Sequence, residues 1–285
     1  MFNQRTVQKE IRFSGVGLHS GKIANVSLLP AEIDSGITIR RKDITNKNNE
    51  IKANFANVSE VFYSTKLQNE YGVCVNTVEH LMAAIWAMKI SNLIIEIDAE
   101  EMPILDGCAQ GFTFLIEAIG IKKQEKIRKT AKIIKEVEIA YDDGRLVKVA
   151  PCSDFIASFN LKSEFGGICA GSHTFEFSRH SFINDISLAR TYCQISEVET
   201  LKSKGLAAGG SLDNALVLDG NKVLNKNGAN YQDECVRHKI MDLIGDIALC
   251  DYFILGHFTG NNSGHELNNK LMRKIFSDEA NFVIL

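Results

Sequence analysis

One segment of the sequence, residues 237–246, carries a histidine and two carboxylates at a regular spacing. His238, Asp242 and Asp246 follow one another at intervals of four residues, so in a helix they lie on one face. An imidazole and a carboxylate one turn apart can reach the same cation, and these two donors suit Zn²⁺. The spacing alone is weak support, because an amphipathic helix with a solvated, salt-bridged face produces it as well.

A second segment, Thr77-Val-Glu-His80, can complete such a site. A catalytic zinc usually has three protein ligands and leaves one position for water. His80 is the natural third ligand, because the carboxylate of the adjacent Glu79 can then act on that water, as the glutamate of a His-Glu-x-x-His helix does. A further histidine, in Ser263-Gly-His265, precedes the last expected helix. Together these segments could form a hydrolytic zinc site, although the spacing alone favours a solvated, salt-bridged helix face.

The hydrophobic pattern predicts the elements that position these residues. The Asn- and Lys-rich stretch 44–72 is less regular and indicates an insertion. The basic stretch 122–132 predicts a solvated linker, and Asp142-Asp143-Gly144 predicts a hairpin turn. Helices are expected at 77–88, with Thr77 as its N-cap, and at 109–119, 195–204, 233–250 and 264–276, and strands at 26–29, 36–41, 92–98, 154–161, 173–177 and 252–258.

The two halves of the chain share one order of elements: strands, an irregular insertion, a helix, a strand and a helix. We therefore predict an α+β fold of two similar domains, residues 1–124 and 125–285, whose layers pack face to face and leave a cleft between them. The insertions fall at about 44–72 in the first domain and about 193–222 in the second.

The composition is that of an ordinary globular protein. Of the 285 residues, 45% are hydrophobic and 24% are charged, and the formal net charge is −3. The Lys and Arg residues are scattered and form no surface that tracks phosphates, so we expect no nucleic-acid partner. The best candidate for a membrane span, 243–255, is interrupted by two aspartates and is shorter than the roughly 18 residues required.

The cysteines and the first residues indicate the compartment. The seven cysteines are odd in number, widely spaced and without a Cys-x-x-Cys pair, which is typical of reduced thiols rather than a disulfide framework. The first ten residues lack the apolar stretch of a signal peptide. We expect a soluble, cytoplasmic protein with a small-molecule substrate and no obligate protein partner.

Several short segments occur in the same order as in one known enzyme family. With them the chain resembles, over nearly its whole length, the UDP-3-O-acyl-N-acetylglucosamine deacetylases (the LpxC family), zinc amidases of lipid A biosynthesis. The resemblance implies two domains packed as a β-α-α-β sandwich, with an insertion in each. The matching segments are Gln4-Arg-Thr6, Gly15-Val-Gly-Leu-His-Ser-Gly21, Thr77-Val-Glu-His80, Pro103-Ile-Leu-Asp-Gly107, Ala189-Arg-Thr191, Lys204-Gly-Leu206, Gly209-Gly-Ser211, Arg237-His-Lys239 with Asp242 and Gly245-Asp246, and Ser263-Gly-His-Glu-Leu-Asn-Asn-Lys270.

The resemblance also implies one zinc ion and a mechanism around it. His80, His238 and Asp242 would hold Zn²⁺, with a water in the fourth position. Glu79 would take a proton from that water as general base. The activated water would attack the acetyl carbonyl on the 2-nitrogen of the glucosamine and release acetate and UDP-3-O-acyl-glucosamine, which commits the sugar to lipid A.

Four further residues receive catalytic roles from the same resemblance. Thr191 would stabilise the oxyanion together with the metal. His265 would protonate the leaving amine, which is too poor a leaving group as an anion. Asp246 would hold His265 in its charged form, and Lys239 would meet a negative charge of the substrate, such as a phosphate.

Substrate contacts are implied as well, mainly in the β-α-β insertion 193–222, which would line a tunnel for the acyl chain. Gly210 would leave room for the chain, Phe159 would stack on uracil, and His19 and Tyr192 would lie near the substrate. The apolar residues that would form the walls are Ile195, Val198, Leu201, Ala215 and Val217.

The chain departs from the family pattern at three places. The usual Phe-x-His-Pro continuation is absent after Phe159, where the chain reads on to Phe165-Gly-Gly167. Tyr192 stands where an apolar aromatic residue is common, and Cys108 stands where serine is usual. These departures concern the nucleotide and acyl contacts rather than the zinc site.

Other interpretations of these residues remain open at this point. The same ligands would serve a zinc hydrolase of another amide or ester, or a non-catalytic binding module with a structural zinc, although structural sites are usually closed by four protein ligands. Cys235, three residues before His238, favours a small buried side chain over a metal ligand. The remaining histidines, which lack a partner at ligand spacing, are expected to be structural or exposed; they are His173, His180 and His257.

Overall fold

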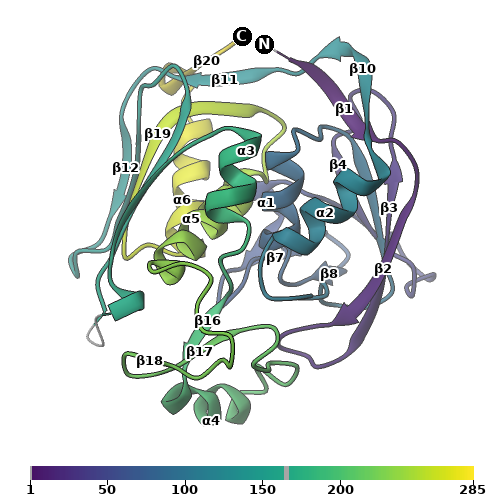
Figure 1. The fold of residues 1–285 in the computed structure, drawn as a ribbon. Coiled ribbons are helices and arrows are strands. Elements are labelled where there is room, and N and C mark those ends of the chain that lie inside the picture. Colours follow the sequence, from purple (N-terminus) through teal and green to yellow (C-terminus); the bar gives the residue numbers. More distant parts are fainter. Residues whose placement is uncertain (1, 164–166) are drawn as a thin grey trace.

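The structure is a computed structural model that describes residues 2–163 and 167–285. It is a mixed α/β fold with several sheets and, among the described residues, six α-helices. In Figure 1 the strands of one large sheet lie on the right, those of the other lie on the left, and the main helices lie between them. The helices are α1 (Glu79–Ala87), α2 (Gln110–Ile119), the single turn α3 (Arg179–Ser181), α4 (Ile195–Ser203), α5 (Glu234–Ile247) and α6 (His265–Phe276).

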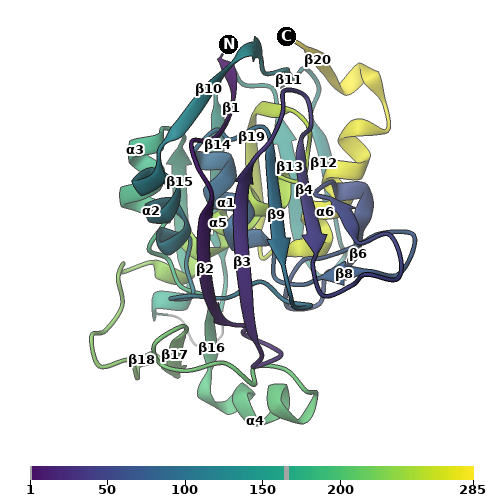
Figure 2. The same ribbon diagram turned by 90° about the vertical axis from the view of Figure 1, so that its right-hand side faces the viewer.

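The sheet formed by the first half of the chain has five strands in the order β2-β3-β9-β4-β5. Its strands alternate buried and accessible residues, as expected of a sheet with one face toward the core. Figure 2 shows this sheet in front of α1 and α5. The strands are β2 (Ile11–Val16), β3 (Ile23–Pro30), β4 (Ile37–Arg41), β5 (Glu50–Lys52) and β9 (Leu93–Ile97).

The second large sheet has seven strands and belongs to the second half of the chain. Its path runs β12-β13-β19-β11-β20, and β14 pairs with β19 and carries β15. The hairpin β12–β13 turns at the expected Asp142-Asp143-Gly144. The Gly144 N–H donates to the Tyr141 carbonyl and closes the turn. The strands are β11 (Thr130–Ile133), β12 (Val137–Ala140), β13 (Leu146–Ala150), β14 (Phe155–Leu161), β15 (Gly171–Glu176), β19 (Phe253–Asn261) and β20 (Phe282–Ile284).

Three small sheets complete the fold. One pairs β1 with β10, one joins β6, β7 and β8 inside and just after the expected insertion, and one joins β16, β17 and β18 next to α4. The strands are β1 (Asn3–Val7), β6 (Val58–Glu60), β7 (Lys66–Gln68), β8 (Cys74–Val75), β10 (Ile121–Ile127), β16 (Tyr192–Gln194), β17 (Leu216–Asp219) and β18 (Lys222–Val223).

Helix α1 is the centre of the hydrophobic core. All nine of its residues are buried, including Glu79 and His80. A helix that is apolar on nearly every side has to be enclosed, and α1 packs against α2 and α5 within one continuous core. Its Trp86 ring stacks on Phe253 of β19, with ring centroids 4.8 Å apart. Burial of this helix therefore fixes where the two polar residues of its first turn must lie.

The helices lie at all five positions that the sequence predicts, with ends that differ by up to three residues. The role predicted for Thr77 is wrong. Helix α1 begins at Glu79 and has no side-chain N-cap, while Thr77 has a positive φ of 57° and donates its hydroxyl to Glu101 Oε1 at 3.0 Å.

The predicted solvated linker at 122–132 is also wrong, because this stretch forms β10 and β11. Strand β10 pairs antiparallel with β1, and β11 runs parallel to β19. The lysines of β10 are exposed, so charge hides the strand pattern in the sequence. The expected domain boundary after residue 124 falls inside β10, and the division into two domains stays a prediction. Within the described residues, no helix has the length and hydropathy needed to cross a bilayer.

The contact between α1 and α5 depends on Gly245. A Cβ at this position would lie 2.2 Å from the Glu79 carbonyl oxygen, which is backbone and cannot rotate away. The two helix backbones therefore approach as closely as they do only because residue 245 has no side chain.

We expect Gly245→Ala to lower the free energy of unfolding by about 1–3 kcal/mol, the usual cost of overpacking. Gly111→Ala in α2 is the matched control, because its Cβ would meet the flexible end of Leu105 at 3.0 Å and alanine favours the helix by about 1 kcal/mol. Urea denaturation of both variants measures the difference. Equal stabilities of Gly245→Ala and the wild type would contradict the account of this contact.

Candidate active site and metal centre

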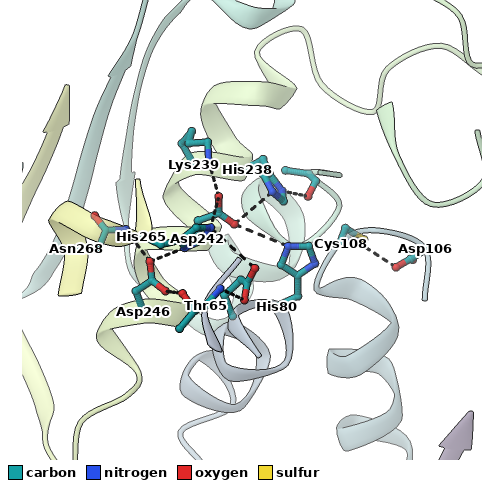
Figure 3. A network of polar contacts seen from close by, with 12 residues as sticks. Thr65, His80, Asp106, Cys108, His238, Lys239, Asp242, Asp246, His265 and Asn268 are labelled. Carbon is teal, nitrogen blue, oxygen red and sulfur yellow. Dashed lines mark hydrogen bonds and ion pairs between the residues drawn. The ribbon is translucent and has the colours of Figure 1, made fainter. Parts of the chain in front are cut away.

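Helices α1 and α5 bring together the three residues predicted as metal ligands (Figure 3). His80 extends from the first turn of α1, and His238 and Asp242 lie one turn apart on α5. The His80 and His238 rings stand almost at right angles, with their centroids 5.1 Å apart. One ligand atom from each of the three residues lies within 4.8 Å of the other two. The predicted spacing therefore produces a real cluster across two helices.

The geometry of this cluster fits a tetrahedral metal ion. Asp242 Oδ1 lies 3.2 Å from His238 Nε2 and 3.8 Å from His80 Nε2. Bonds of about 2.0 Å at tetrahedral angles would place ligand atoms roughly 3.3 Å apart. Asp242 Oδ1 is buried and accepts no hydrogen bond from the described residues, so it is an acceptor without a donor. A cation between the three atoms would satisfy it.

Both imidazoles are held in the neutral form that binds metals. Burial lowers the pKa of His80 to about 3, and burial also lowers the pKa of His238. His238 Nδ1 lies 3.0 Å from the Ala189 carbonyl oxygen, which can only accept, so Nδ1 carries the proton. The lone pair of His238 is thus left on Nε2, which faces Asp242 and His80.

Lys239 keeps the Asp242 carboxylate ionised. Its Nζ donates to Asp242 Oδ2 at 2.7 Å, which leaves Oδ1 for the cluster. Burial acts to raise the pKa of Asp242, but His238 and Lys239 outweigh it, so this pKa lies well below its usual range. Asp242 therefore presents a negative charge at the centre of the site.

Glu79 lies beside the cluster, one residue before His80 in α1. Its Oε2 accepts the backbone N–H of Thr65 at 3.1 Å, and its Oε1 lies 3.9 Å from His265 Nε2. Burial raises the pKa of Glu79 to about 7, although the positive charge of His265 works against the rise. A carboxylate with a pKa in this range can accept and release a proton near neutral pH.

Asp246 holds His265 in its charged form, in contrast to the neutral imidazoles of His80 and His238. His265 Nδ1 donates to Asp246 Oδ2 at 2.9 Å. Burial alone would lower the pKa of His265, but the carboxylate of Asp246 outweighs burial and raises it to about 9. The ring is therefore an imidazolium whose Nε2 points toward Glu79 and Asp242, at 3.9 and 4.0 Å. A charged imidazole can donate a proton but cannot bind a metal.

Two residues that the sequence analysis did not single out complete this network. Thr65 donates its hydroxyl to Asp246 Oδ1 at 2.6 Å, and Asn268 donates its amide to Asp246 Oδ2 at 2.8 Å. Thr65 lies in the irregular stretch 44–72, where no pattern marks it. Asn268 follows His265 by three residues in α6, so the helical spacing after His265 could have indicated it.

A cavity of about 520 Å³ opens over these residues. Its wall combines the histidines and carboxylates described above with the apolar side chains of α4, β16 and β17. Pockets that bind small molecules usually have this size, and they combine apolar walls with a few polar groups in the same way. The predicted site residues that line it are His19, Glu79, His80, Thr191, Tyr192, Ile195, Val198, Leu201, Gly210, Ala215, Val217, His238, Lys239, Asp242 and His265.

Phe159 does not lie at this cavity. Its side chain is only 2% exposed, and it belongs to the core with the other inward residues of β14, Phe155 and Ala157. The ring packs so closely on Gly260 of β19 that a Cβ there would lie 2.4 Å from it. The structure thus does not place Phe159 where it could stack on a base, because the alternation of β14 turns it inward. Part of the Phe165-Gly-Gly167 departure lies outside the described residues.

Glu101 organises the loop that carries His19. Its two carboxylate oxygens accept the backbone N–H groups of His19 and Ser20 at 2.8 and 2.7 Å, and Oε1 also accepts the Thr77 hydroxyl. A carboxylate with three donors is a rigid anchor. The loop before β3 is therefore tied to Thr77, two residues before α1, and its His19 lines the cavity.

The remaining histidines lie outside the cluster, as expected. His173 pairs with Asp233 at 3.0 Å, and His257 Nε2 lies 2.9 Å from the Ser158 hydroxyl. Cys235 is fully buried, in agreement with the prediction of a small core side chain, and its Sγ contacts that of Cys169.

The sequence pattern of the LpxC family, UDP-3-O-acyl N-acetylglycosamine deacetylase, matches residues 4–277. The chain belongs to this family. A protein of Thioalkalivibrio sulfidiphilus named UDP-3-O-acyl-N-acetylglucosamine deacetylase is 43% identical over 281 residues, which cover 98% of this chain and 91% of that protein. A protein of Aliarcobacter butzleri with the same name is 41% identical over 282 residues, which cover 99% and 92% of the two chains.

We expect Thr65→Val to lower the free energy of unfolding by about 1–3 kcal/mol, because the buried Asp246 carboxylate loses one of its donors. Thr65→Ser is the matched control, since it keeps the hydroxyl and removes only a methyl group. Urea denaturation compares the two variants. A valine variant as stable as the serine variant would show that this hydrogen bond contributes nothing.

Proposed function

We propose that this protein removes the N-acetyl group of UDP-3-O-acyl-N-acetylglucosamine and so carries out the committed step of lipid A biosynthesis, in the cytoplasm. The observation that carries the proposal is the convergence of three metal-ligand side chains, a carboxylate and an imidazolium on one cavity. Family membership supplies the substrate, because the related proteins are named for it. We propose the two-domain β-α-α-β sandwich of the family for the chain as well.

The metal we propose is one Zn²⁺ ion, held by His80, His238 and Asp242. Two neutral imidazoles and one carboxylate match the ligand sets of catalytic zinc sites, and the described residues supply no fourth ligand to close the site. When bound, zinc lowers the pKa of a water and polarises a carbonyl group. The orphaned Asp242 Oδ1 is the feature that supports this assignment most directly.

Glu79 and His265 divide the proton transfers between them. The Glu79 carboxylate takes a proton from the water that attacks the acetyl carbonyl. His265 Nε2 donates its proton to the amide nitrogen as the carbon–nitrogen bond breaks, so the amine leaves neutral. Glu79 Oε1 and His265 Nε2 lie 3.9 Å apart, so both groups can reach the same reacting group. Asp246 keeps His265 charged until that step.

Thr191 and Lys239 contribute to binding the reacting group and the substrate charge. Thr191 lies on the cavity wall just before β16, where its hydroxyl can donate to the acetyl oxygen. Lys239 uses one donor for Asp242 and has two more N–H groups for a negative charge of the substrate. His19 and Tyr192 line the same cavity and complete the polar contacts that we propose.

The apolar wall suits the acyl chain of the substrate. Leu201 of α4 and Ala215 and Val217 near β17 face the cavity, and Gly210 adds no side chain to it. Burial of methylene groups contributes about 0.8 kcal/mol each, so this wall would select an acylated sugar over a bare one. An amide or ester substrate without an acyl chain would leave this wall uncovered.

We expect His238→Ala to lose its zinc, because two ligands no longer suffice to hold the ion. His265→Ala should retain the metal, since its ring is charged and bound to Asp246. His173→Ala, outside the cluster, is the control. Elemental analysis of the purified proteins measures the zinc content, and a chelator should abolish deacetylation until zinc is restored. Loss of zinc from His265→Ala would make that residue a ligand instead.

We expect Glu79→Gln to retain zinc and fold but to lose deacetylation by about 10²–10⁴-fold, the usual contribution of a general base. Glu266→Gln makes the same change in a half-exposed residue next to His265 and should remain active. Acetate release from UDP-3-O-acyl-N-acetylglucosamine measures the activity. Near-normal turnover of Glu79→Gln would remove this residue as the base, and an inactive wild type would overturn the proposed substrate.

A further inference from the structure

A second cavity, of about 630 Å³, lies away from the proposed active site and has different lining residues. It is formed where segments from the first half of the chain meet the turn between β10 and β11 and the residues that follow α5. In Figure 1 the β10–β11 turn lies near the two termini, at the opposite end of the molecule from α4. The segments that line it include 34–37, 52–54, 91–92, 128–129 and 250–252.

The side chain that sets this cavity apart is Arg128, which is 5% exposed. Its guanidinium lies over the Phe253 ring at 5.9 Å, and Nη1 makes one long contact of 3.4 Å with the Ile90 carbonyl oxygen. Its Nε has no hydrogen-bond partner among the described residues, and none of their carboxylates lies within ion-pair distance. A buried guanidinium without an anion is costly to the fold, so a partner for it is expected.

A second buried group on the same wall also lacks a partner. The hydroxyl of Ser91 makes no hydrogen bond with the described residues, although its backbone N–H donates to the Arg5 carbonyl. Ser91 and Arg128 both line this cavity, and each has a buried donor without a partner among the described residues, Ser91 Oγ and Arg128 Nε. Two orphaned donors on a shared wall are the pattern of a site that awaits an acceptor ligand.

The charges around the cavity favour an anion. Four basic side chains line it, Lys52, Lys126, Arg128 and Lys129, against the two acidic side chains Asp34 and Asp251. Asp34 is already bound to Lys126 and Gln4. Among the described residues, Asp251 accepts one long contact of 3.5 Å from Asn54, and it reduces the positive potential without removing it. The wall therefore has an excess of two positive charges.

We propose that this cavity binds a small molecule through a phosphate group, at Arg128 and Ser91. A phosphate carries about two negative charges at neutral pH, which matches the excess, whereas a single carboxylate would leave one positive charge unbalanced. The planar guanidinium can donate two parallel hydrogen bonds to phosphate oxygens, and the serine hydroxyl can donate a third. The volume exceeds that of phosphate alone, so the group belongs to a larger solute.

The test is calorimetric titration of the zinc-loaded protein with inorganic phosphate at constant ionic strength. The wild type should bind phosphate saturably, and Arg128→Met, which keeps the apolar stem over Phe253, should bind it about tenfold more weakly or not at all. Arg12→Met removes an arginine whose side chain is 77% exposed, and it should bind as the wild type does. This control separates a built site from a general loss of positive charge.

If Arg128→Met does not fold, Ser91→Ala provides the test. This variant removes one hydrogen-bond donor without changing the charge, and it should weaken phosphate binding severalfold. Equal affinities of wild type, Arg128→Met and Ser91→Ala would overturn the proposal, since any phosphate bound would then sit elsewhere, for example at the zinc.

A third experiment uses phosphatidylcholine vesicles that contain phosphatidic acid. Co-sedimentation that depends on Arg128, without binding of free phosphate, would assign the site to a lipid and overturn the small-molecule ligand.

Discussion

The close crossing of α1 and α5 is the constraint on which the rest of the site depends. At Gly245 the backbone of α5 lies so near the Glu79 carbonyl that a methyl group would not fit. This contact sets the distance from His80, on one helix, to His238 and Asp242, on the other. Because α1 is buried on all sides, apolar packing rather than polar contact fixes its position. The core thus positions the three proposed metal ligands.

Burial makes each charged group in the site costly in free energy. The two aspartates of α5 in this site each have hydrogen-bonding partners that offset this cost. Asp242 has Lys239 at 2.7 Å, and Asp246 has His265, Thr65 and Asn268 within 2.9 Å. These pairs create two environments a few ångströms apart. In one, burial leaves imidazoles neutral and able to bind a metal. In the other, a carboxylate behind the ring keeps His265 charged and able to donate a proton.

The sequence predicts those parts of the site that local spacing determines. The intervals from His238 to Asp242 and Asp246 are helical, and they lie on one helix as expected. Thr65 could not be predicted, because it meets Asp246 across 181 residues of chain and periodicity says nothing of such contacts. The stretch 122–132 misleads because its lysines hide a strand. Phe159 shows the reverse case: the family resemblance suggested a substrate contact, whereas the alternation of β14 in the structure buries the side chain.

The central claim, one zinc ion held jointly by α1 and α5, is tested most directly by diffraction from crystals of the protein as purified, with data collected on both sides of the zinc absorption edge. The account predicts a single anomalous peak with His80 Nε2, His238 Nε2 and an Asp242 oxygen as its protein ligands, at about 2.0–2.2 Å. A zinc peak at another place, for instance between the sulfurs of Cys169 and Cys235, with none between these helices, would contradict it.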